Sequence, residues 1–435
     1  MRKLLLLTLG LVLALTAGAA EVFDIGNLEY EILTNTSFNA VKVRGVSSAG
    51  QTATSLTIPG NVTYNGTLYR VYEIRESAFA SNTNLKTVYI KFGVNTVGSR
   101  AFQGCTALSS VTLGSSVASI GSYAFDGCTN LTSMYHVGFM PITDIYANSI
   151  PNNSGMRLYI SNSTYSVPSD FSSKTGWSKF ATISHERACY DFSLGSHNYA
   201  VGAPDNYDPT ATRNAYLVSV DGNTTTVQPG AVFTNYDVKF IIYGIAQGAC
   251  RDKTSITAID LTNSTNLQVI EASAFSGCTN LSSITLRKGL TTIKNYAFSH
   301  TAITSLALPA SVNNLGDYYF VDNCPNLTSI SVASENSSFA AHDDALTSKD
   351  KKTLYRVPEG KTSYVMSELT EKINSYAFYQ CKVTGISCYY GVTTISSHAF
   401  EGCTKLTQAR IPSSVTTLGD YVFMGCTSLS KLLVN

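Results

Sequence analysis

The chain has 435 residues, more than one hydrophobic core usually serves, so several domains or an elongated repeat architecture are expected. Charged residues make up only 14% of it and the formal net charge is +1, which argues against nucleic acid or an anionic membrane surface as its partner. The polar surface must come from neutral Ser, Thr, Asn and Tyr side chains, so a partner would be met through hydrogen bonds and aromatic contacts.

Residues 1–20 have the pattern of a secretory signal peptide. Arg2 and Lys3 precede an apolar run over residues 4–15, and small residues follow it. We expect cleavage near Ala19 or Ala20. The run is too short to span a bilayer and no later stretch is apolar enough to do so, so we expect a soluble, exported mature chain without a membrane span.

The chain then repeats itself with a period of 23 residues. The dipeptide Ala-Phe ends at Phe79, Phe102 and Phe125, with 23 residues between neighbours, and the same pattern returns in the second half of the chain. A leucine and a short alternating segment follow each Ala-Phe, as in Leu-Ser-Ser-Val-Thr-Leu at 108–113. Alternation with a period of two predicts a strand with one buried face. Each coil is therefore expected to hold a strand, a return segment and a short helical or irregular turn.

A coil of this size cannot enclose its own apolar face, so neighbouring coils must stack and bury a continuous core of Leu, Val, Ile and Phe. Stacked strands then form a parallel sheet with one coil about every 4.8 Å. We expect an α/β-type solenoid with stacked parallel strands.

The segments outside the repeats are similar to each other and predict two tandem modules. Residues 23–30 resemble residues 192–199, and residues 59–62 resemble residues 229–232. We expect each module to open with a short β leader that covers the exposed end of its solenoid.

Residues 108–128 and 406–426 resemble the repeat of the BspA-type leucine-rich repeat family, which reads approximately L-x-x-I-x-L-P-x-x-V-x-x-I-G-x-x-A-F-x-x-C. The resemblance implies leucine-rich repeats, a cap that ends the first array, and a hairpin excursion within the second. The expected divisions are a signal peptide at 1–20, a leader at 21–70, repeats at 71–137, a cap at 138–185, a junction and second leader at 186–244, and repeats at 245–435 with the hairpin at about 333–361.

Ten cysteines in an exported chain suggest disulfides. Asn82 and Thr301 hold the same slot as most of them, which favours a small buried position over a disulfide or a metal ligand. Disulfides between adjacent coils remain open, as does a pair among Cys189, Cys250 and Cys388, which lie outside the slot. Seven cysteines fall three or four residues after a repeat phenylalanine: Cys105, Cys128, Cys278, Cys324, Cys381, Cys403 and Cys426.

The densest group of reactive side chains is His185, Glu186, Cys189 and Asp191, with His197 nearby. A cysteine and a histidine brought together by the fold could serve nucleophilic catalysis. These residues lie where one module passes to the next, so a polar junction is the simpler interpretation.

A second acidic group contains His342, Asp343, Asp344 and Asp350. The regular alternation and the turn glycine of an EF-hand loop are missing, so a solvated hairpin is favoured over a calcium site. The sequence also lacks the common metalloprotease, hydrolase, phosphate-loop and zinc-finger motifs. We expect no catalytic residue, no metal and no cofactor, and a protein that is not an enzyme.

The strand register predicts which side chains form the outer surface. If the apolar residues of each strand point inward, the residues between them point out, and tyrosine and arginine among these are types enriched in interface hot spots. The candidate ligand-binding residues are Thr87, Tyr89, Thr112, Tyr135 and Arg410.

The family resemblance implies an adhesin-like binding role for an extracellular or host-surface protein whose identity is unknown. Three alternatives stay open: a glycan-binding protein, a secreted enzyme with a site at 185–197, and an architectural envelope component. The last would self-associate through the C-terminal coil, where the sequence shows no cap.

Overall fold

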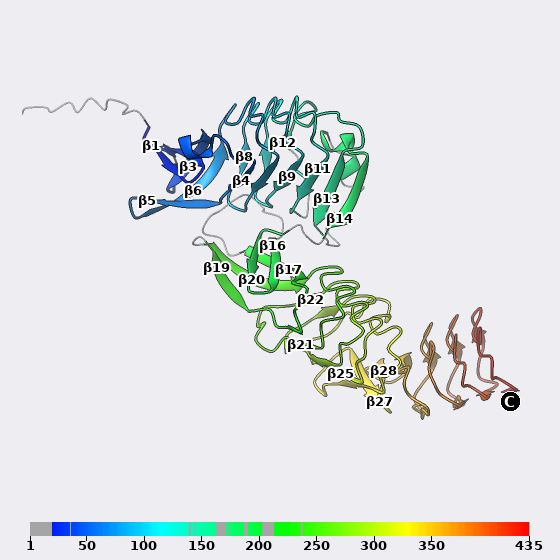
Figure 1. Ribbon diagram of the computed structural model, residues 1–435. Helices are drawn as coiled ribbons and strands as arrows, with labels where there is room; N and C mark the ends of the chain where they lie inside the picture. Colours follow the sequence, from blue (N-terminus) through cyan, green and yellow to red (C-terminus); the bar gives the residue numbers. More distant parts are fainter. Residues whose placement is uncertain are drawn as a thin grey trace, which may run out of the picture.

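The computed structural model describes residues 20–34, 36–138, 141–142, 144–161, 171–173, 175–186, 190–201, 213–235 and 238–434. The predicted signal peptide lies outside the described residues except for its last position. The chain forms two elongated bodies, module one (residues 20–186) and module two (residues 190–434), and the leader of module two lies against one edge of module one (Figure 1).

Module one opens with a small sheet in which β1, β2 and β3 are antiparallel and β3 pairs with β6 in parallel. A short hairpin is formed by β5 with β6. Because the end of β6 pairs with β8, the leader sheet continues directly into the solenoid and covers its first coil. The leader strands are β1 (Val22–Ile25), β2 (Leu28–Leu33), β3 (Ala40–Val46), β5 (Asn61–Tyr64) and β6 (Thr67–Ile74).

The coils of module one build two walls of parallel strands, and we call the wall with the longer strands the strand wall and the other the return wall. In the strand wall Val88, Val111, Met134 and Leu158 lie side by side and point into the core. The strand wall contains β4 (Ser55–Ile58), β7 (Thr87–Ile90), β9 (Ser110–Leu113), β11 (Ser133–His136), β13 (Arg157–Ser161) and β14 (Thr182–Glu186), and the return wall contains β8 (Thr96–Val97), β10 (Ser119–Ile120) and β12 (Asp144–Ile145).

Module two repeats this plan with its own leader, in which β17 and β20 are parallel and β20 continues into the return wall. The leader strands are β15 (Phe192–Leu194), β16 (His197–Val201), β17 (Arg213–Val220), β19 (Val232–Asn235) and β20 (Val238–Ile245). The return wall contains β22 (Val269–Ile270), β24 (Thr292–Ile293), β30 (Lys372–Ile373), β32 (Thr394–Ile395) and β34 (Thr417–Leu418).

The strand wall of module two is broken into three separate sheets. A new sheet starts at β25 and another at β31. Before each of these strands the turn after the repeat phenylalanine is one residue shorter than in the coil that contains Phe275. The spacing is five residues from Phe298 to Ile303 and from Phe378 to Val383, compared with six from Phe275 to Leu281. The shorter turn coincides with the loss of pairing between β23 and β25, whereas before β31 the adjoining coil over residues 361–370 contains no strand. These strands are β18 (Thr226–Val227), β21 (Ala258–Asp260) and β23 (Ser283–Thr285), then β25 (Ser305–Leu308) and β26 (Ser329–Val332), then β31 (Gly385–Ser387), β33 (Gln408–Ile411) and β35 (Lys431–Val434).

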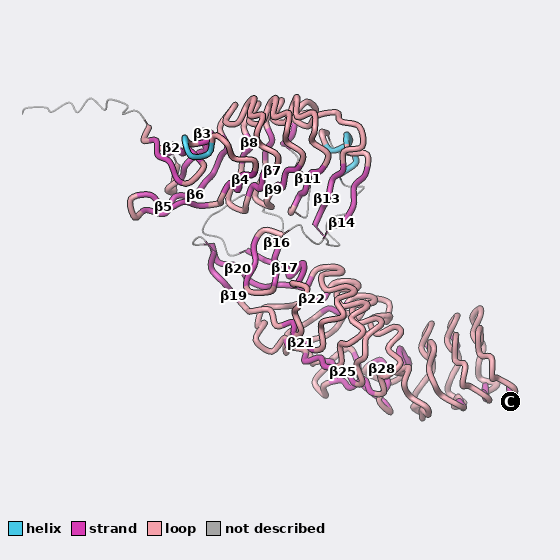
Figure 2. Tube along the Cα trace, viewed as in Figure 1, coloured by secondary structure: helices cyan, strands magenta, loops and turns pink. Residues whose placement is uncertain are grey.

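An excursion interrupts the regular coils between β26 and β30 (Figure 2). It consists of the antiparallel strands β27 (Phe339–His342), β28 (Ala345–Ser348) and β29 (Thr353–Arg356). Because β29 pairs in parallel with β30, the excursion itself becomes part of the return wall, and the stack of coils continues beyond it.

Phenylalanine rings from successive coils stack along the interior. The ring centroids of Phe79 and Phe102 are 5.0 Å apart and those of Phe102 and Phe125 are 5.2 Å apart, with nearly parallel planes. The same stacking joins Phe378 and Phe400 at 4.6 Å in module two. The predicted stacked interior is therefore confirmed for the repeat phenylalanines.

The expected α/β-type class was wrong, because the fold is a β-solenoid. Among the described residues the helical pieces are two 3-10 turns, Ser48–Gly50 and Trp177–Lys179, and the two residues Phe171 and Ser172. The segment around each Ala-Phe pair forms turns because it contains residues with positive φ, such as Tyr123 at 60° and Gly127 at 71°. A right-handed α-helix cannot continue through two left-handed residues four positions apart.

Candidate functional site

The strand wall of module one brings three of the predicted site residues together. Tyr89 of β7, Thr112 of β9 and Tyr135 of β11 are direct neighbours in the parallel register, and we call these three residues the module-one strip. The ring of Tyr135 stacks on Tyr159 of β13 at 4.7 Å. Thr87, at the start of β7, is exposed on the same face.

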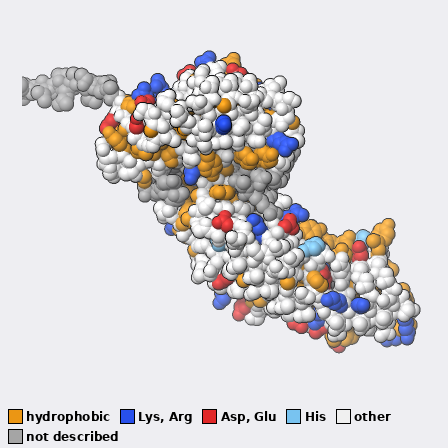
Figure 3. All heavy atoms as spheres, in the orientation of Figure 1, with side chains coloured by type: hydrophobic (Ala, Val, Ile, Leu, Met, Phe, Trp, Pro, Cys, Tyr) orange, Lys and Arg blue, Asp and Glu red, His pale blue; other side chains and the backbone are white. Residues whose placement is uncertain are grey.

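The strip faces the leader of module two, so much of it is covered. The Tyr89 hydroxyl donates a hydrogen bond of 2.7 Å to the Tyr190 carbonyl. Tyr135 and Tyr159 pack against a buried cluster that joins Phe92 and Val137 of module one to the core of module two. Apolar side chains gather along the edge of module one where the two modules meet (Figure 3). Sequence periodicity predicted that Tyr89 and Tyr135 point out of the solenoid, but it held no information on which body they would meet.

The turns that follow the strands of the strand wall form the rest of this contact, and we call this row of turns the rim. Phe92, in the turn after β7, is buried and lies edge-to-face with Phe240 of module two at 5.3 Å. Ser115 occupies the corresponding place one coil later. Its N–H and hydroxyl donate hydrogen bonds of 2.9 and 2.6 Å to the two carboxylate oxygens of Asp191.

Of the reactive side chains predicted around residues 185–197, Asp191 has a clear structural role in joining the two modules. Its carboxylate also accepts the Val201 N–H at 2.8 Å, so it ties the module-two leader to the rim of module one. Burial raises the pKa of Asp191 to about 6, and the hydrogen bonds from Ser115 and Val201 oppose that rise. His197 lies in β16 and accepts the Gln228 N–H, and its pKa is lowered by burial. Cys189 lies outside the described residues, as do the side chains of His185 and Glu186.

Arg410 is separate from the strip. It lies in β33 of module two, between Ser387 and Leu433 in the register, and its side chain is exposed. The five predicted site residues therefore occupy two surfaces, one at the module junction and one near the far end of module two.

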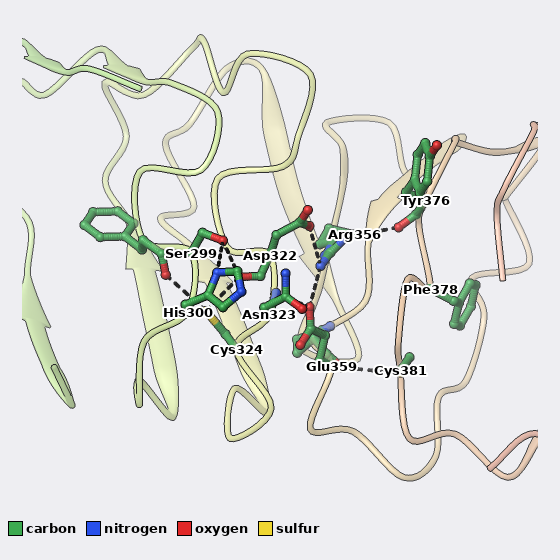
Figure 4. Close-up of polar contacts among 12 residues, drawn as sticks. Ser299, His300, Asp322, Asn323, Cys324, Arg356, Glu359, Tyr376, Phe378 and Cys381 are labelled. Atoms are coloured by element: carbon green, nitrogen blue, oxygen red, sulfur yellow. Dashed lines mark hydrogen bonds and ion pairs between the residues drawn. The ribbon is translucent and has the colours of Figure 1, made fainter. Parts of the chain in front are cut away.

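A buried ionic cluster in module two was missed by the sequence analysis (Figure 4). Arg356 is only 1% exposed, and its Nη2 lies 2.9 Å from a carboxylate oxygen of both Asp322 and Glu359. Burial raises the pKa of Glu359 to about 7 and also raises that of Asp322, while Arg356 opposes both shifts. Because the guanidinium is sealed between coils, this cluster fits a structural role between the hairpin excursion and the coils on either side.

A signal for this cluster exists in the sequence. The Val357 N–H donates to the Ala377 carbonyl just as the Phe378 N–H donates to the Ala399 carbonyl, so Arg356-Val357 replaces Ala-Phe in the excursion coil. In the other coils this slot holds an uncharged residue, most often alanine, so a charged residue there demands a buried partner.

The acidic residues of the excursion have protein partners. Lys361 Nζ lies 3.4 Å from carboxylate oxygens of both Asp343 and Asp344, and Asp350 accepts hydrogen bonds from Ser348 and Lys352. Among the described residues, no group of three His, Cys, Asp or Glu side chains is arranged to hold a metal ion.

The cysteine slot has a hydrogen-bonding role. The Cys105 thiol donates to the Phe79 carbonyl and the Cys128 thiol to the Phe102 carbonyl, each at 3.1 Å and each to the preceding coil. In the same slot Thr301 donates its hydroxyl to the Phe298 carbonyl. No disulfide joins the nine described cysteines. The slot therefore accepts a small donor, which explains how threonine replaces cysteine there.

A cavity of about 640 Å³ lies along the rim of module two. It is lined by residues at and just after the ends of β23, β25 and β26, among them Leu286, Pro309 and Val332, with Lys288 and Glu335 also in its wall. The rim of module two therefore has open space beside it at these coils.

The family of the chain follows from its repeats. Residues 50–175, 244–343 and 359–435 match the BspA type leucine rich repeat region, in six copies. The chain is a BspA-type leucine-rich repeat protein. The match covers more than half of the chain and includes coils of both modules.

Solved structures similar to this BspA-type protein come from several bacteria. A leucine rich cell surface protein of Faecalibacterium prausnitzii is 20% identical, with 96% of each chain covered and a TM-score of 0.31. The pneumococcal vaccine antigen PcpA is 17% identical, with 96% of this chain and 82% of that chain covered and a TM-score of 0.38. A leucine-rich repeat protein of Bacteroides ovatus is 18% identical, with 94% of each chain covered and a TM-score of 0.38.

No curated protein matches this BspA-type chain. In the part of the chain that the structure describes, no helix has the length and hydropathy needed to cross a membrane.

Proposed function

We propose that this chain is an exported binding protein that engages an extracellular protein through the surface of its solenoids and carries out no reaction. The observation that carries the proposal is the last sheet of the module-two strand wall, which holds outward side chains such as Ser387, Gln408 and Arg410 in fixed register over a buried stacked core. Repeat solenoids of this kind present extended surfaces to protein partners.

The polar groups that would be candidates for catalysis support the same proposal. Asp191 is committed to hydrogen bonds that join the modules, and Arg356 is sealed against Asp322 and Glu359. Both groups are buried, Asp191 at 4% and Arg356 at 1% exposed, so each supports structure.

Export rests on the pattern of residues 1–20. Expression of the full chain in a bacterial host, followed by N-terminal sequencing of the secreted protein, should give a chain that starts near Ala20 or Glu21. A chain that stays in the cell with Met1 intact would contradict export.

Binding is tested by site-specific photo-crosslinking on the full chain. A photoreactive residue at Ser387, on the strand wall, should crosslink to a defined extracellular protein when the chain is mixed with intact host or bacterial cells. The same residue at Lys372, in the return wall, is the matched control and should give no such product. Crosslinking only to released glycans, or equal crosslinking at both sites, would contradict the proposed function.

A further inference from the structure

The rim of module two contains a copy of the rim site at which module one meets the leader of module two. Residues 114–117 read Gly-Ser-Ser-Val and residues 412–415 read Pro-Ser-Ser-Val. One coil earlier, Phe92 corresponds to Tyr390, so an aromatic residue and a serine lie 23 positions apart in both modules.

The backbone of the two turns is the same. The Ser116 hydroxyl donates to the Val94 carbonyl at 2.9 Å, and the Ser414 hydroxyl donates to the Val392 carbonyl at 2.8 Å. The Val117 N–H donates to the Gly114 carbonyl and the Val415 N–H donates to the Pro412 carbonyl, each at 3.1 Å. Ser115 and Ser413 are therefore equivalent positions in the coil.

In module one these positions are occupied by another part of the chain. Ser115 holds the carboxylate of Asp191, and Phe92 packs on the ring of Phe240. Tyr89, on the adjoining strand, donates to the Tyr190 carbonyl. The rim site of module one thus recognises a carboxylate next to aromatic side chains.

In module two the equivalent positions are exposed. Tyr390 is 76% exposed, and Ser413, Ser387 and Arg410, which correspond to Ser115, Tyr89 and Thr112, are exposed as well. Neither the N–H nor the hydroxyl of Ser413 donates to an acceptor in the described chain. The apolar surface continues onto the preceding coil through Val365, 61% exposed, and Leu369, 59% exposed.

The charge around this surface selects an acidic partner. Arg410 replaces the neutral Thr112 and is the cation nearest to the rim in sequence. Lys405 precedes β33 and Lys431 begins β35, so these two exposed cations lie toward the other end of the strands. The acidic residues between positions 382 and 434 are Glu401 and Asp420, and both lie in the turns around the Ala-Phe position. On the preceding coil Glu368 is exposed, and the Asp343 carboxylate, which pairs with Lys361, accepts the Val365 N–H at 2.8 Å.

Building on the proposed function, we propose that Tyr390, Arg410 and Ser413 form the docking site for the extracellular partner, and that this partner presents a carboxylate beside an aromatic side chain on a protein segment. The carboxylate accepts hydrogen bonds from the N–H and hydroxyl of Ser413 and pairs with Arg410. The aromatic side chain packs on Tyr390 and the apolar surface of Val365 and Leu369.

The test is selection of a phage-displayed random peptide library on the full chain, followed by fluorescence anisotropy with the selected peptides after synthesis. Selected peptides should carry Asp or Glu next to an aromatic residue. Arg410→Glu and Tyr390→Ala should each weaken their binding about tenfold or more, as expected for charged and aromatic hot spots. Glu368→Gln should strengthen binding, because it removes the acidic group from the border of the site.

Matched controls are Lys372→Glu, an exposed cation of the return wall, and Tyr421→Ala, an exposed tyrosine outside the rim, and both should leave binding unchanged. Selection of no such peptide, or equal binding by all variants, would overturn the proposal. Retention on heparin-agarose that Arg410→Glu abolishes, without any selected peptide, would assign the surface to an anionic glycan and also overturn it.

The same variants separate this inference from the proposed function. If the crosslinked extracellular protein binds the Arg410→Glu and Tyr390→Ala chains as well as the wild type, the docking site is wrong and the binding function stands. If no extracellular protein crosslinks to the wild-type chain, the binding function itself fails.

Discussion

The carboxylate of Asp191 accepts both the N–H and the hydroxyl of Ser115, a residue 76 positions earlier in the chain. This pair joins the leader of the second solenoid to a rim turn of the first. Since Phe92 packs on Phe240 beside it, the contact combines a buried polar bond with an aromatic contact. The two modules are therefore held together by specific interactions and not by chain connectivity alone.

Replacement of Asp191 should loosen the contact between the modules. Asp191→Ala leaves the Ser115 and Val201 donors buried without their acceptor, which costs about 1–3 kcal/mol for each buried group left unsatisfied. Hydrogen exchange measured by mass spectrometry should show faster exchange in the peptides that contain Ser115 and Val201. Asp221→Ala, at an exposed carboxylate of the same leader, is the control, and equal exchange in both variants would contradict the role of Asp191.

The titration of Glu359 predicts a pH dependence of stability. Burial raises its pKa from 4.5 to about 7, so the folded protein holds this proton more tightly than the unfolded chain does. The stabilisation from the protonated group is present below pH 4.5 and is lost as the pH rises through about 7. Glu359→Gln cannot titrate, so its unfolding temperature relative to the wild type should increase between these two pH values.

Differential scanning fluorimetry at several pH values measures this difference. Asp191 titrates in both chains, so its contribution cancels in the comparison. Glu371→Gln, at an exposed glutamate paired with Lys352, should follow the wild type at every pH. Parallel curves for the wild type and Glu359→Gln would show that the buried cluster does not control the pH response.

The stability of the protein should depend on whether the residue in the cysteine slot can donate a hydrogen bond, and not only on its size. Cys128→Val removes the thiol donor of the Phe102 carbonyl, which still accepts the Cys105 N–H, and should lower the free energy of unfolding by about 0.5–1.5 kcal/mol. Cys128→Thr can donate its hydroxyl to the Phe125 carbonyl of its own coil, as Thr301 does to Phe298, and should be less destabilising. Urea denaturation of the two variants makes the comparison, and equal losses would show that the slot selects for volume alone.

The stacked rings should account for much of the stability of each module. Phe102 is fully buried between Phe79 and Phe125, so Phe102→Ala should lower the free energy of unfolding by about 3–5 kcal/mol. Tyr123→Ala, in the next turn but 40% exposed, should cost less than about 1 kcal/mol. Urea denaturation that ranked the two variants in the opposite order would contradict the ring stack as a core element.

The sequence alone predicted the repeat, the strands and the inward phenylalanines, because these follow from local periodicity. Val88, Val111 and Met134 lie at equivalent coil positions, and stacking coils of equal length leaves only one register for them. The expected helical segments were wrong because the spacing of apolar residues does not show which residues adopt a left-handed backbone conformation. Positive φ at Tyr123, in a residue type that rarely adopts it, became visible only in the fold.

Only the tertiary structure decided which of the outward side chains remain exposed. Tyr89 and Arg410 occupy the same kind of outward strand position, yet Tyr89 bonds to the second module and Arg410 faces solvent. Arg356 likewise found its partners, Asp322 and Glu359, across neighbouring coils. A repeat determines the environment of each residue within its own stack, whereas contacts between separate bodies depend on how the chain folds back over long distances.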